Sequence, residues 1–419
     1  MPKRNAIYAQ SGGVTAVINA TACGLIEAAS SHRDLIGKVL AGRNGIIGVL
    51  REELIDTSKE SRSTIQRLRD TPGGAFGSCR YKLSNPTPDD PDIRRLFEVF
   101  AAHDVGYFFY NGGGDSQDTA NKVSKLSQEL DYPVQCIGIP KTVDNDLSGT
   151  DSCPGFGSVA KYVAISTKEA ALDVASMSES STKVFILEVM GRHAGWIAAA
   201  GGLAGEDANE PPHLILFPEV PFDESSFLRK VESTVKRIGY CVVVASEGVQ
   251  NSDGNFLADA GTKDAFGHAQ LGGVAPVLAG LVKEALGLKY HYAVADYLQR
   301  SSRHIASKVD VEQAYAVGKG AIAAVAAGQN DVMIGIKRLQ DEPYRWRLAP
   351  INLNKVANIE RKVPRSFRTK DEYGITARAR RYLEPLIRGE AYPLYRRGMP
   401  RYAETKNQLV AKKLPGYDV

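Results

Sequence analysis

Short apolar runs that alternate with helical stretches constrain the fold of this chain more than any other feature. The runs are residues 6–9, 105–110, 134–139, 184–189, 213–217 and 240–245. Residues 16–29, 160–176 and 311–327 instead carry apolar side chains at helical spacing. Strands that alternate with helices are typical of α/β proteins with a mainly parallel sheet. The sequence therefore predicts an α/β fold.

Length, charge and cysteine content narrow the class of protein. A chain of 419 residues can bury a large core and is expected to divide into two domains. The net charge of +4 is too small to indicate nucleic-acid binding, and the five cysteines lack metal-ligand spacing, which indicates a reducing compartment. No apolar run approaches the ~20 residues of a membrane helix, and no signal-peptide pattern precedes the first predicted strand. We expect a cytoplasmic protein.

Two carboxylates and a lysine follow the predicted strand at 134–139. In the segment Pro-Lys-Thr-Val-Asp-Asn-Asp at 140–146, Lys141, Asp144 and Asp146 stand where the strand ends. Ligands of open α/β sheets bind at that edge. One carboxylate could take a proton from an attacking hydroxyl while the other holds a metal ion, and the lysine could bind phosphate oxygens. This combination favours phosphoryl transfer.

Other predicted strands also end in polar or glycine-rich segments. These segments are residues 10–13, 111–116, 190–192 and 246–248. Glycines at 12 and 13, just before a predicted helix, would let backbone amides approach a phosphate. Because the carboxyl ends of parallel strands share one edge, we expect the segments to line a single cleft.

In their order along the chain, these motifs resemble those of the phosphofructokinase family from about Asn5 to Ala327. The resemblance implies two Rossmann-like, three-layer α/β domains with mainly parallel sheets and an active site in the cleft between them. Residues 1–150 with about 300–340 would form the phosphoryl-donor (pyrophosphate) domain, and residues 151–299 the sugar-phosphate domain. Residues 341–419 would be a C-terminal extension that packs on the body or another subunit, or an effector or partner surface.

The resemblance also indicates the phosphoryl donor. The residue at the position of Lys141 is glycine in most ATP-using members and lysine in pyrophosphate-using ones. Asp115 stands where ATP-using members have glycine, and its carboxylate would crowd a nucleotide. Gly114 departs from the family, which has there an aspartate that helps hold magnesium, so Mg²⁺ is expected at Asp115 and Asp146. The expected pyrophosphate site is Gly12, Gly13, Gly113, Gly114, Asp115, Ser116 and Lys141.

Catalytic and sugar-binding roles follow from the same resemblance. Asp144 would be the base, assisted by Lys141, Thr142 and Arg80, which ends the motif Gly-Ser-Cys-Arg. Tyr297 is the residue typical of pyrophosphate-using members at its position. Lys183 and His291 occupy positions that often serve the neighbouring subunit, which implies a homodimer or homotetramer. The expected sugar-phosphate site is Thr142, Asp144, Lys183, Met190, Gly191, Arg192, Glu247, His291, Tyr297 and Arg300.

The expected reaction is reversible phosphoryl transfer from pyrophosphate to the 1-hydroxyl of fructose 6-phosphate. Two alternatives stay open: an ATP-dependent phosphofructokinase that happens to carry Lys141, and a catalytically silent sugar-phosphate-binding protein, suggested by Gly114. The sequence leaves open whether sedoheptulose 7-phosphate is also an acceptor. Cys23 and Glu27 replace the arginines of an allosteric nucleotide site, so that site is expected to be missing. His268 receives no role beyond a structural one.

Overall fold

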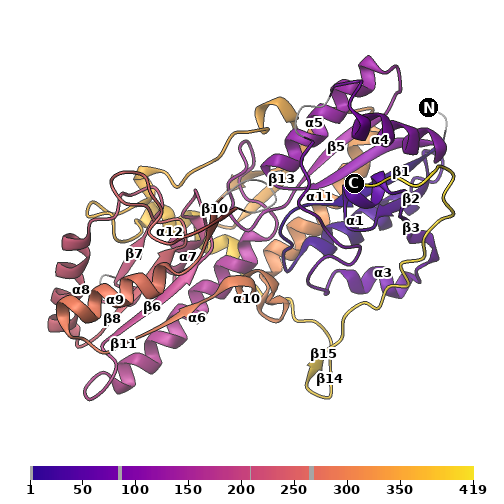
Figure 1. Ribbon diagram of the computed structural model, residues 1–419. Helices are drawn as coiled ribbons and strands as arrows, with labels where there is room; N and C mark the ends of the chain where they lie inside the picture. The colour runs from indigo at the N-terminus through magenta and orange to yellow at the C-terminus, as the bar shows by residue number, and fades with distance from the viewer. Residues whose placement is uncertain (1–2, 84–86, 208, 264–268) are drawn as a thin grey trace.

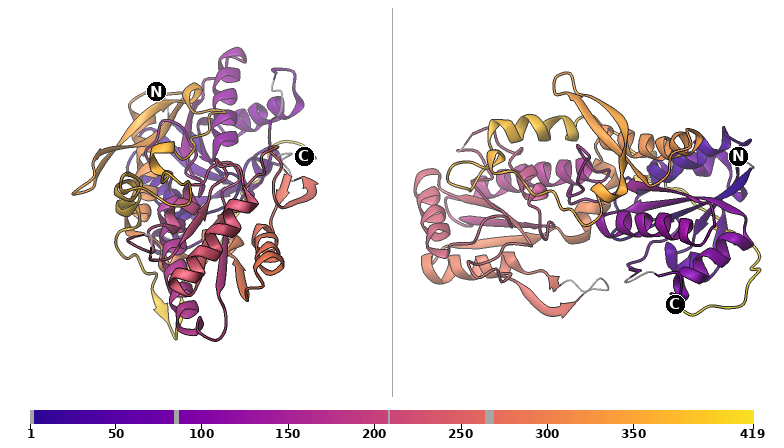
Figure 2. Two further views of the ribbon diagram at one scale, coloured as in Figure 1. Left: turned by 90° about the vertical axis from the view of Figure 1, so that its left-hand side faces the viewer. Right: turned by 90° about the horizontal axis from the view of Figure 1, so that it is seen from above.

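The computed structural model describes residues 3–83, 87–207, 209–263 and 269–419. Two α/β domains lie side by side, each built around its own sheet (Figures 1 and 2). Helix α6 (Phe156–Met177) leads from the larger domain into the smaller one, and the segment after β11 (Tyr290–Val294) leads back. The predicted fold class, two α/β domains with mainly parallel sheets, is confirmed.

The larger domain contains a seven-stranded sheet in the order β13-β12-β5-β4-β1-β2-β3. The inner strands pair in parallel, while β3 and β13 are antiparallel edge strands. The strands are β1 (Arg4–Gln10), β2 (Ile36–Gly42), β3 (Leu54–Asp56), β4 (Val105–Gly112), β5 (Gln135–Pro140), β12 (Val332–Gln340) and β13 (Arg345–Asn352).

Helices cover both faces of this sheet, which explains the apolar runs within its central strands, such as residues 6–9 of β1 and 107–110 of β4. Ala6 and Tyr8 of β1 share one core with α1 (Ile18–Ser30), α3 (Arg62–Leu68) and α11 (Lys308–Ala326). Ile7 and Ala9 point to the opposite face, against α2 (Ile46–Leu50), α4 (Pro91–Ala102) and α5 (Gly114–Glu129). All eight residues of β4 are buried. The result is a three-layer domain.

The smaller domain contains a four-stranded parallel sheet in the order β11-β6-β8-β7. Its remaining strands are β6 (Val184–Val189), β7 (Leu214–Leu216) and β8 (Cys241–Ser246). One face packs on α6, α7 (Trp196–Gly201) and α12 (Ala377–Leu383), and the other on α8 (Glu224–Ile238) and α9 (Val274–Leu286). Edge strand β11 is different, because four of its five residues are exposed.

After α10 (Asp296–Ser301) the chain returns to the larger domain through α11 and the β12–β13 hairpin. Residue 340, the predicted boundary of the C-terminal extension, ends β12. The predicted boundary therefore falls inside a hairpin whose two strands belong to one sheet.

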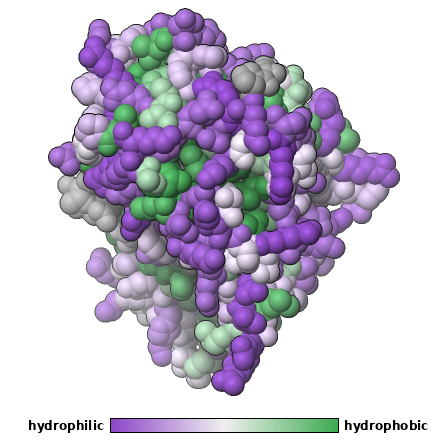
Figure 3. All heavy atoms as spheres, turned by 90° about the vertical axis from the view of Figure 1, so that its right-hand side faces the viewer, coloured by the Kyte–Doolittle hydropathy of each residue, from purple (hydrophilic) through white to green (hydrophobic). Residues whose placement is uncertain are grey.

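The last part of the chain packs along the larger domain (Figures 1 and 2). Leu409 forms an isolated bridge with Ile55, and the Val410 amide donates to the Leu54 carbonyl at 2.8 Å, so the tail covers edge strand β3. Figure 3 shows the molecule from the side of the larger domain, where most of the surface is hydrophilic. A short hairpin of β14 (Tyr395–Arg396) and β15 (Met399–Pro400) stands out just before the tail. Among the described residues, no helix is both long and apolar enough to span a membrane.

Candidate active site

A cleft of about 590 Å³ is formed by the loops that follow β1, β4, β5, β6 and β8. Its walls come from both domains, at the carboxyl ends of the strands, as expected for open α/β sheets. Most residues predicted for the site line this one cleft: Gly12, Gly13, Arg80, Gly113, Gly114, Asp115, Ser116, Lys141, Thr142, Asp144, Asp146, Met190, Arg192, Glu247 and Arg300.

The loop after β5 carries the paired carboxylates. The Lys141 amide donates to the Gly112 carbonyl at 3.1 Å, which joins this loop to the one after β4. The Asp144 amide donates to Thr142 Oγ1 at 3.1 Å. Asn145, between the two aspartates, has a φ of 55°, a left-handed conformation that asparagine tolerates better than most residues. This sharp turn lets Asp144 and Asp146 both face the cleft.

Burial shifts the ionisation of the charged groups in the cleft. It lowers the pKa of Lys141 to about 8, and the nearby Arg300 and Arg80 act in the same direction while Asp144 opposes them. Burial also raises the pKa of Asp144, against the effect of Lys141. For Asp146, burial and the charge of Asp144 together raise the pKa to about 7. The carboxylates are therefore crowded in a way that bound cations would relieve.

Three cations converge on the glycine turn after β1. Gly12 has a φ of +73°, and a Cβ placed there would lie 3.4 Å from Lys141 Nζ. A Cβ at Gly13 would lie only 2.6 Å from a guanidinium nitrogen of Arg300, so any larger residue would make this guanidinium shift. The Gly12 amide donates to the Cys79 carbonyl at 2.9 Å, which brings the neighbouring Arg80 to the same turn.

Helix α5 presents its amino end to the cleft. The helix begins at Gly114, with Gly113 as its N-cap and Asp115 in its first turn. Backbone amides at such an end are suited to bind an anion. Asp115 forms an ion pair with Lys82 at 3.2 Å, and Lys82 itself lines the cleft. Lys82 was not predicted, although it follows Arg80 by only two residues.

The wall from the smaller domain is held mainly by hydrogen bonds to its backbone. The Met190 amide donates to Gln299 Oε1 at 3.2 Å, and Ser246 Oγ donates to the Gly191 carbonyl at 2.6 Å. Gly191 shapes this loop with a φ of 127°. Burial and the charge of Asp144 raise the pKa of Glu247 to about 7. The buried Gln299 was not predicted, although it lies within the Tyr-Leu-Gln-Arg motif.

Four predicted residues are not among the described residues that line the cleft of a single chain: Lys183, Gly191, His291 and Tyr297. The Arg300 guanidinium lies 3.8 Å from the Tyr297 ring centroid, so these two side chains do meet, but Tyr297 is 63% exposed. Lys183 precedes β6 and His291 pairs with Phe185, at the amino ends of their strands. The length of β6 puts Lys183 about 20 Å from the site end of that strand.

Two further predictions concern residues away from the cleft. Glu27 on α1 accepts a hydrogen bond from the Tyr315 hydroxyl of α11 at 2.6 Å, and Cys23 is buried beside it. The expected lack of an allosteric nucleotide site there stays a prediction. His268 lies outside the described residues.

The C-terminal segment supplies cleft residues that the sequence did not reveal. Asn358, Ile359 and Glu360 line the cleft, and Glu360 Oε1 lies 2.9 Å from Nδ1 of His193, another lining residue. His193 stands next to Arg192 and was within reach of motif reasoning. Residues 358–360 belong to no recognisable motif. Packing against distant parts of the chain brings them to the cleft.

The fold and the cleft define a two-domain α/β protein with cations and paired carboxylates gathered at the carboxyl ends of parallel strands. The chain belongs to the phosphofructokinase family, whose model, described as "Phosphofructokinase", matches residues 5–325.

Several relatives are similar to this chain over its full length. Proteins named pyrophosphate–fructose 6-phosphate 1-phosphotransferase from Halomonas elongata and Methylococcus capsulatus are each 60% identical, over 100% and 99% of both chains. The crystal structure of a pyrophosphate-dependent phosphofructokinase from Marinobacter aquaeolei is 61% identical, with a TM-score of 0.91, over 99% of this chain and 100% of that one.

Proposed function

We propose that this protein transfers a phosphoryl group reversibly between pyrophosphate and the 1-hydroxyl of fructose 6-phosphate. The relatives that match over their full length carry the name of this reaction. The observation that carries the proposal is the buried Lys141, whose ammonium lies in the cleft against Gly12 with Arg80, Arg300 and Asp144 as charged neighbours. Such a cation can neutralise a compact polyphosphate.

Asp115 supports pyrophosphate over ATP as the donor. Its ion pair with Lys82 stands at the first turn of α5, on the wall of the cleft. A nucleotide would have to place its α-phosphate and ribose beyond its β- and γ-phosphates, where the carboxylate of Asp115 would repel it. Pyrophosphate ends at its second phosphate and avoids this contact.

Asp144 is the general base in this proposal. Burial raises its pKa, which makes its carboxylate a better acceptor for the proton of the sugar 1-hydroxyl. As that oxygen forms its bond to phosphorus, the bridging P–O bond of pyrophosphate breaks and phosphate leaves. Lys141, Arg80, Thr142 and the amide of Gly13 stabilise the charge on the phosphoryl group in transit.

The smaller domain holds the acceptor. Glu247 accepts hydrogen bonds from sugar hydroxyls, which donate well to carboxylates. Met190, Arg192 and Arg300 position the sugar phosphate, with Arg300 reaching the turn at Gly13 and so joining the two substrates.

The residues present fit Mg²⁺ as a cofactor. Asp146 Oδ1 is buried and has no hydrogen-bond partner among the described residues, so it is available as a ligand. The described residues contain no cluster of three His, Cys, Asp or Glu side chains that could hold a metal. That suits Mg²⁺, which uses one or two carboxylates together with water and substrate phosphates. Asp146 would hold the ion, with Asp115 as the second expected ligand, and the ion would supply charge that screens the phosphates.

A homodimer or homotetramer is part of the proposal. Lys183 and His291 lie at the amino ends of β6 and β11, so a second subunit has to bring them to a cleft. Large apolar side chains are exposed next to them on β11 and α10: Tyr292, Val294, Tyr297 and Leu298. An exposed apolar group of this kind is typical of subunit contacts. The free cysteines support a cytoplasmic location.

The reverse reaction tests this function. Fructose 1,6-bisphosphate, phosphate and Mg²⁺ should yield pyrophosphate, because the bonds exchanged are closer in free energy than those in ATP-dependent transfer. Failure to form pyrophosphate while fructose 1,6-bisphosphate binds would contradict the proposal and favour a silent binding protein or an ATP-dependent enzyme.

A further inference from the structure

The C-terminal segment at 358–361 contacts the loop that bears the paired carboxylates. Leu147 and Glu360 form an antiparallel bridge, and the Arg361 amide donates to the Asp146 carbonyl at 2.7 Å. This segment lies beyond residues 5–325, the part matched by the family model. A segment outside the matched region therefore pairs with the loop that carries Asp144 and Asp146.

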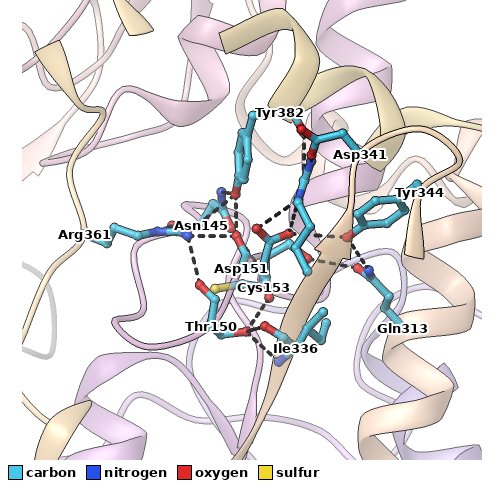
Figure 4. A network of polar contacts seen from close by, with 12 residues as sticks. Asn145, Thr150, Asp151, Cys153, Gln313, Ile336, Asp341, Tyr344, Arg361 and Tyr382 are labelled. Atoms are coloured by element: carbon cyan, nitrogen blue, oxygen red, sulfur yellow. Dashed lines mark hydrogen bonds and ion pairs between the residues drawn. The ribbon is translucent and has the colours of Figure 1, made fainter. Parts of the chain in front are cut away.

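The Arg361 side chain binds the backbone of the same loop (Figure 4). Its Nη2 and Nε donate to the Asn145 carbonyl at 2.8 and 3.2 Å. Its Nη1 donates to the carbonyls of Thr150 and Asp151 at 2.9 and 2.8 Å. One guanidinium therefore makes four hydrogen bonds to three carbonyl groups, which is more than the three donors of a lysine ammonium can make.

The turn held in this way is the one that separates the two carboxylates. Asn145 adopts its left-handed conformation between Asp144 and Asp146, and its side chain is also fixed. Its Oδ1 accepts from the Cys153 amide at 3.0 Å and its Nδ2 donates to the Tyr382 hydroxyl at 3.0 Å. A sparsely populated backbone conformation persists when its surroundings hold it in place.

Arg361 also ties this turn to the smaller domain. Its guanidinium lies 4.7 Å from the ring centroid of Trp196, at the start of α7, and its Nη2 lies 3.3 Å from the Tyr382 hydroxyl of α12. The Tyr382 hydroxyl in turn donates to the Asp151 carbonyl. The catalytic loop of one domain is thus fixed against helices of the other.

We propose that Arg361 is a positioning residue for phosphoryl transfer. It holds the Asn145 turn so that Asp144 and Asp146 point into the cleft, which makes the C-terminal extension part of the catalytic apparatus. Arg361 acts through the loop and is not itself a catalytic residue. This inference rests on the proposed function, because it assigns Asp144 and Asp146 their roles.

Kinetics of Arg361→Lys and Arg361→Ala, compared with Arg365→Ala, test the proposal. Arg365 is a matched control, because its guanidinium caps the carbonyls of Arg368, Thr369 and Lys370 on the same C-terminal segment. A misplaced catalytic group costs on the order of 100-fold in rate, so kcat should fall by about that factor in both Arg361 variants. The KM values for both substrates should change by less than about threefold, and Arg365→Ala should keep its kcat.

Chemical rescue separates positioning from mere stability. Guanidinium ion at millimolar concentration should restore part of the kcat of Arg361→Ala and leave Arg365→Ala unchanged. A kcat of Arg361→Ala equal to that of the wild type would overturn the proposal. So would a loss that guanidinium does not reverse and that matches the fraction of unfolded protein.

A measurement without turnover keeps the two proposals apart. Hydrogen exchange of the amides at 142–151 should be faster in Arg361→Ala than in the wild type and unchanged in Arg365→Ala. If the wild-type protein proves inactive with pyrophosphate, the proposed function fails, and the exchange data still decide whether Arg361 holds the loop. Equal exchange in all three proteins contradicts the inference whatever the donor.

Discussion

The two walls of the cleft differ in how they use charge. The larger domain buries Lys141 and holds the partly buried Asp144 in a loop after β5, and it adds Arg80 from a neighbouring turn. The smaller domain relies on backbone fixed by Gln299 and Ser246, with Glu247 as its partly buried carboxylate. Crowded charge suits bond making and breaking, whereas a shaped, hydrogen-bonded wall suits recognition. Changes on the first wall should therefore affect kcat, and changes on the second should affect KM.

The largest effect is expected from Asp144→Ala. Without its base the enzyme loses proton transfer from the sugar hydroxyl, which contributes up to roughly 10⁴-fold in rate. We expect kcat to fall by about 10³-fold or more while the affinity for fructose 6-phosphate changes little. Steady-state kinetics with pyrophosphate, together with calorimetric binding of the sugar phosphate, measure both quantities. An active Asp144→Ala enzyme would remove Asp144 from its role.

Lys141→Met should have the next largest effect. Loss of one preorganised charge at the reacting group costs about 10²–10³-fold in kcat. Because the pKa of Lys141 is lowered to about 8, the wild-type kcat/KM should decline as the pH rises through that value and the lysine loses its proton. The variant should lack this decline. An alkaline limb that persists in Lys141→Met would assign it to another group.

Glu247→Gln tests the recognition wall. A neutral amide accepts sugar hydroxyls less strongly than a carboxylate, which corresponds to about a tenfold rise in KM for fructose 6-phosphate. The kcat and the KM for pyrophosphate should stay within about threefold of the wild type. A variant that loses kcat and keeps its KM would place Glu247 in the chemistry and break the division between the walls.

Asp115→Gly sharpens the comparison within the first wall. Removing the carboxylate paired with Lys82 should open room for a nucleotide, so measurable ATP-dependent activity should appear. We expect a gain of about tenfold over any wild-type activity with ATP, since a single repulsive contact is relieved. Parallel assays with ATP and with pyrophosphate give the ratio of the two activities. Unchanged donor preference would show that other groups exclude ATP.

The smallest effect concerns stability and pH. Burial and Asp144 raise the pKa of Glu247 from its usual 4.5 to about 7, so between these values the folded state binds more protons than the unfolded state. Stability of the ligand-free protein should therefore fall as the pH rises through this window. Thermal unfolding at several pH values should show a decline in Tm that is about 2 °C smaller in Glu247→Gln. If Tm depended on pH in the same way in both proteins, the raised pKa of Glu247 would be contradicted.

Sequence reasoning worked best where structure is local. The strand before Lys141 is buried on both faces, so its apolar run and the polar loop after it were visible in the sequence. The edge strands β11 and β13 were missed: β11 exposes four of its five residues, and β13 consists of exposed and partly buried positions. Neither carries the continuous apolar run of a central strand.

The same distinction holds for the site. Gln299 lies inside a recognised motif and Lys82 lies two residues after one, so both were close to residues that the sequence did indicate. Asn358 and Glu360 line the cleft, and Arg361 binds the loop beside it, through pairing with residues more than 200 positions earlier, such as Leu147 and Asn145. Pairing at that sequence distance leaves no periodic or motif signal in a single chain.

The most direct test of the account is an assay of the purified protein with fructose 6-phosphate and Mg²⁺, with pyrophosphate as donor in one reaction and ATP in the other. We expect fructose 1,6-bisphosphate to form with pyrophosphate only. Formation of that product with ATP only would contradict the roles assigned to Lys141 and Asp115.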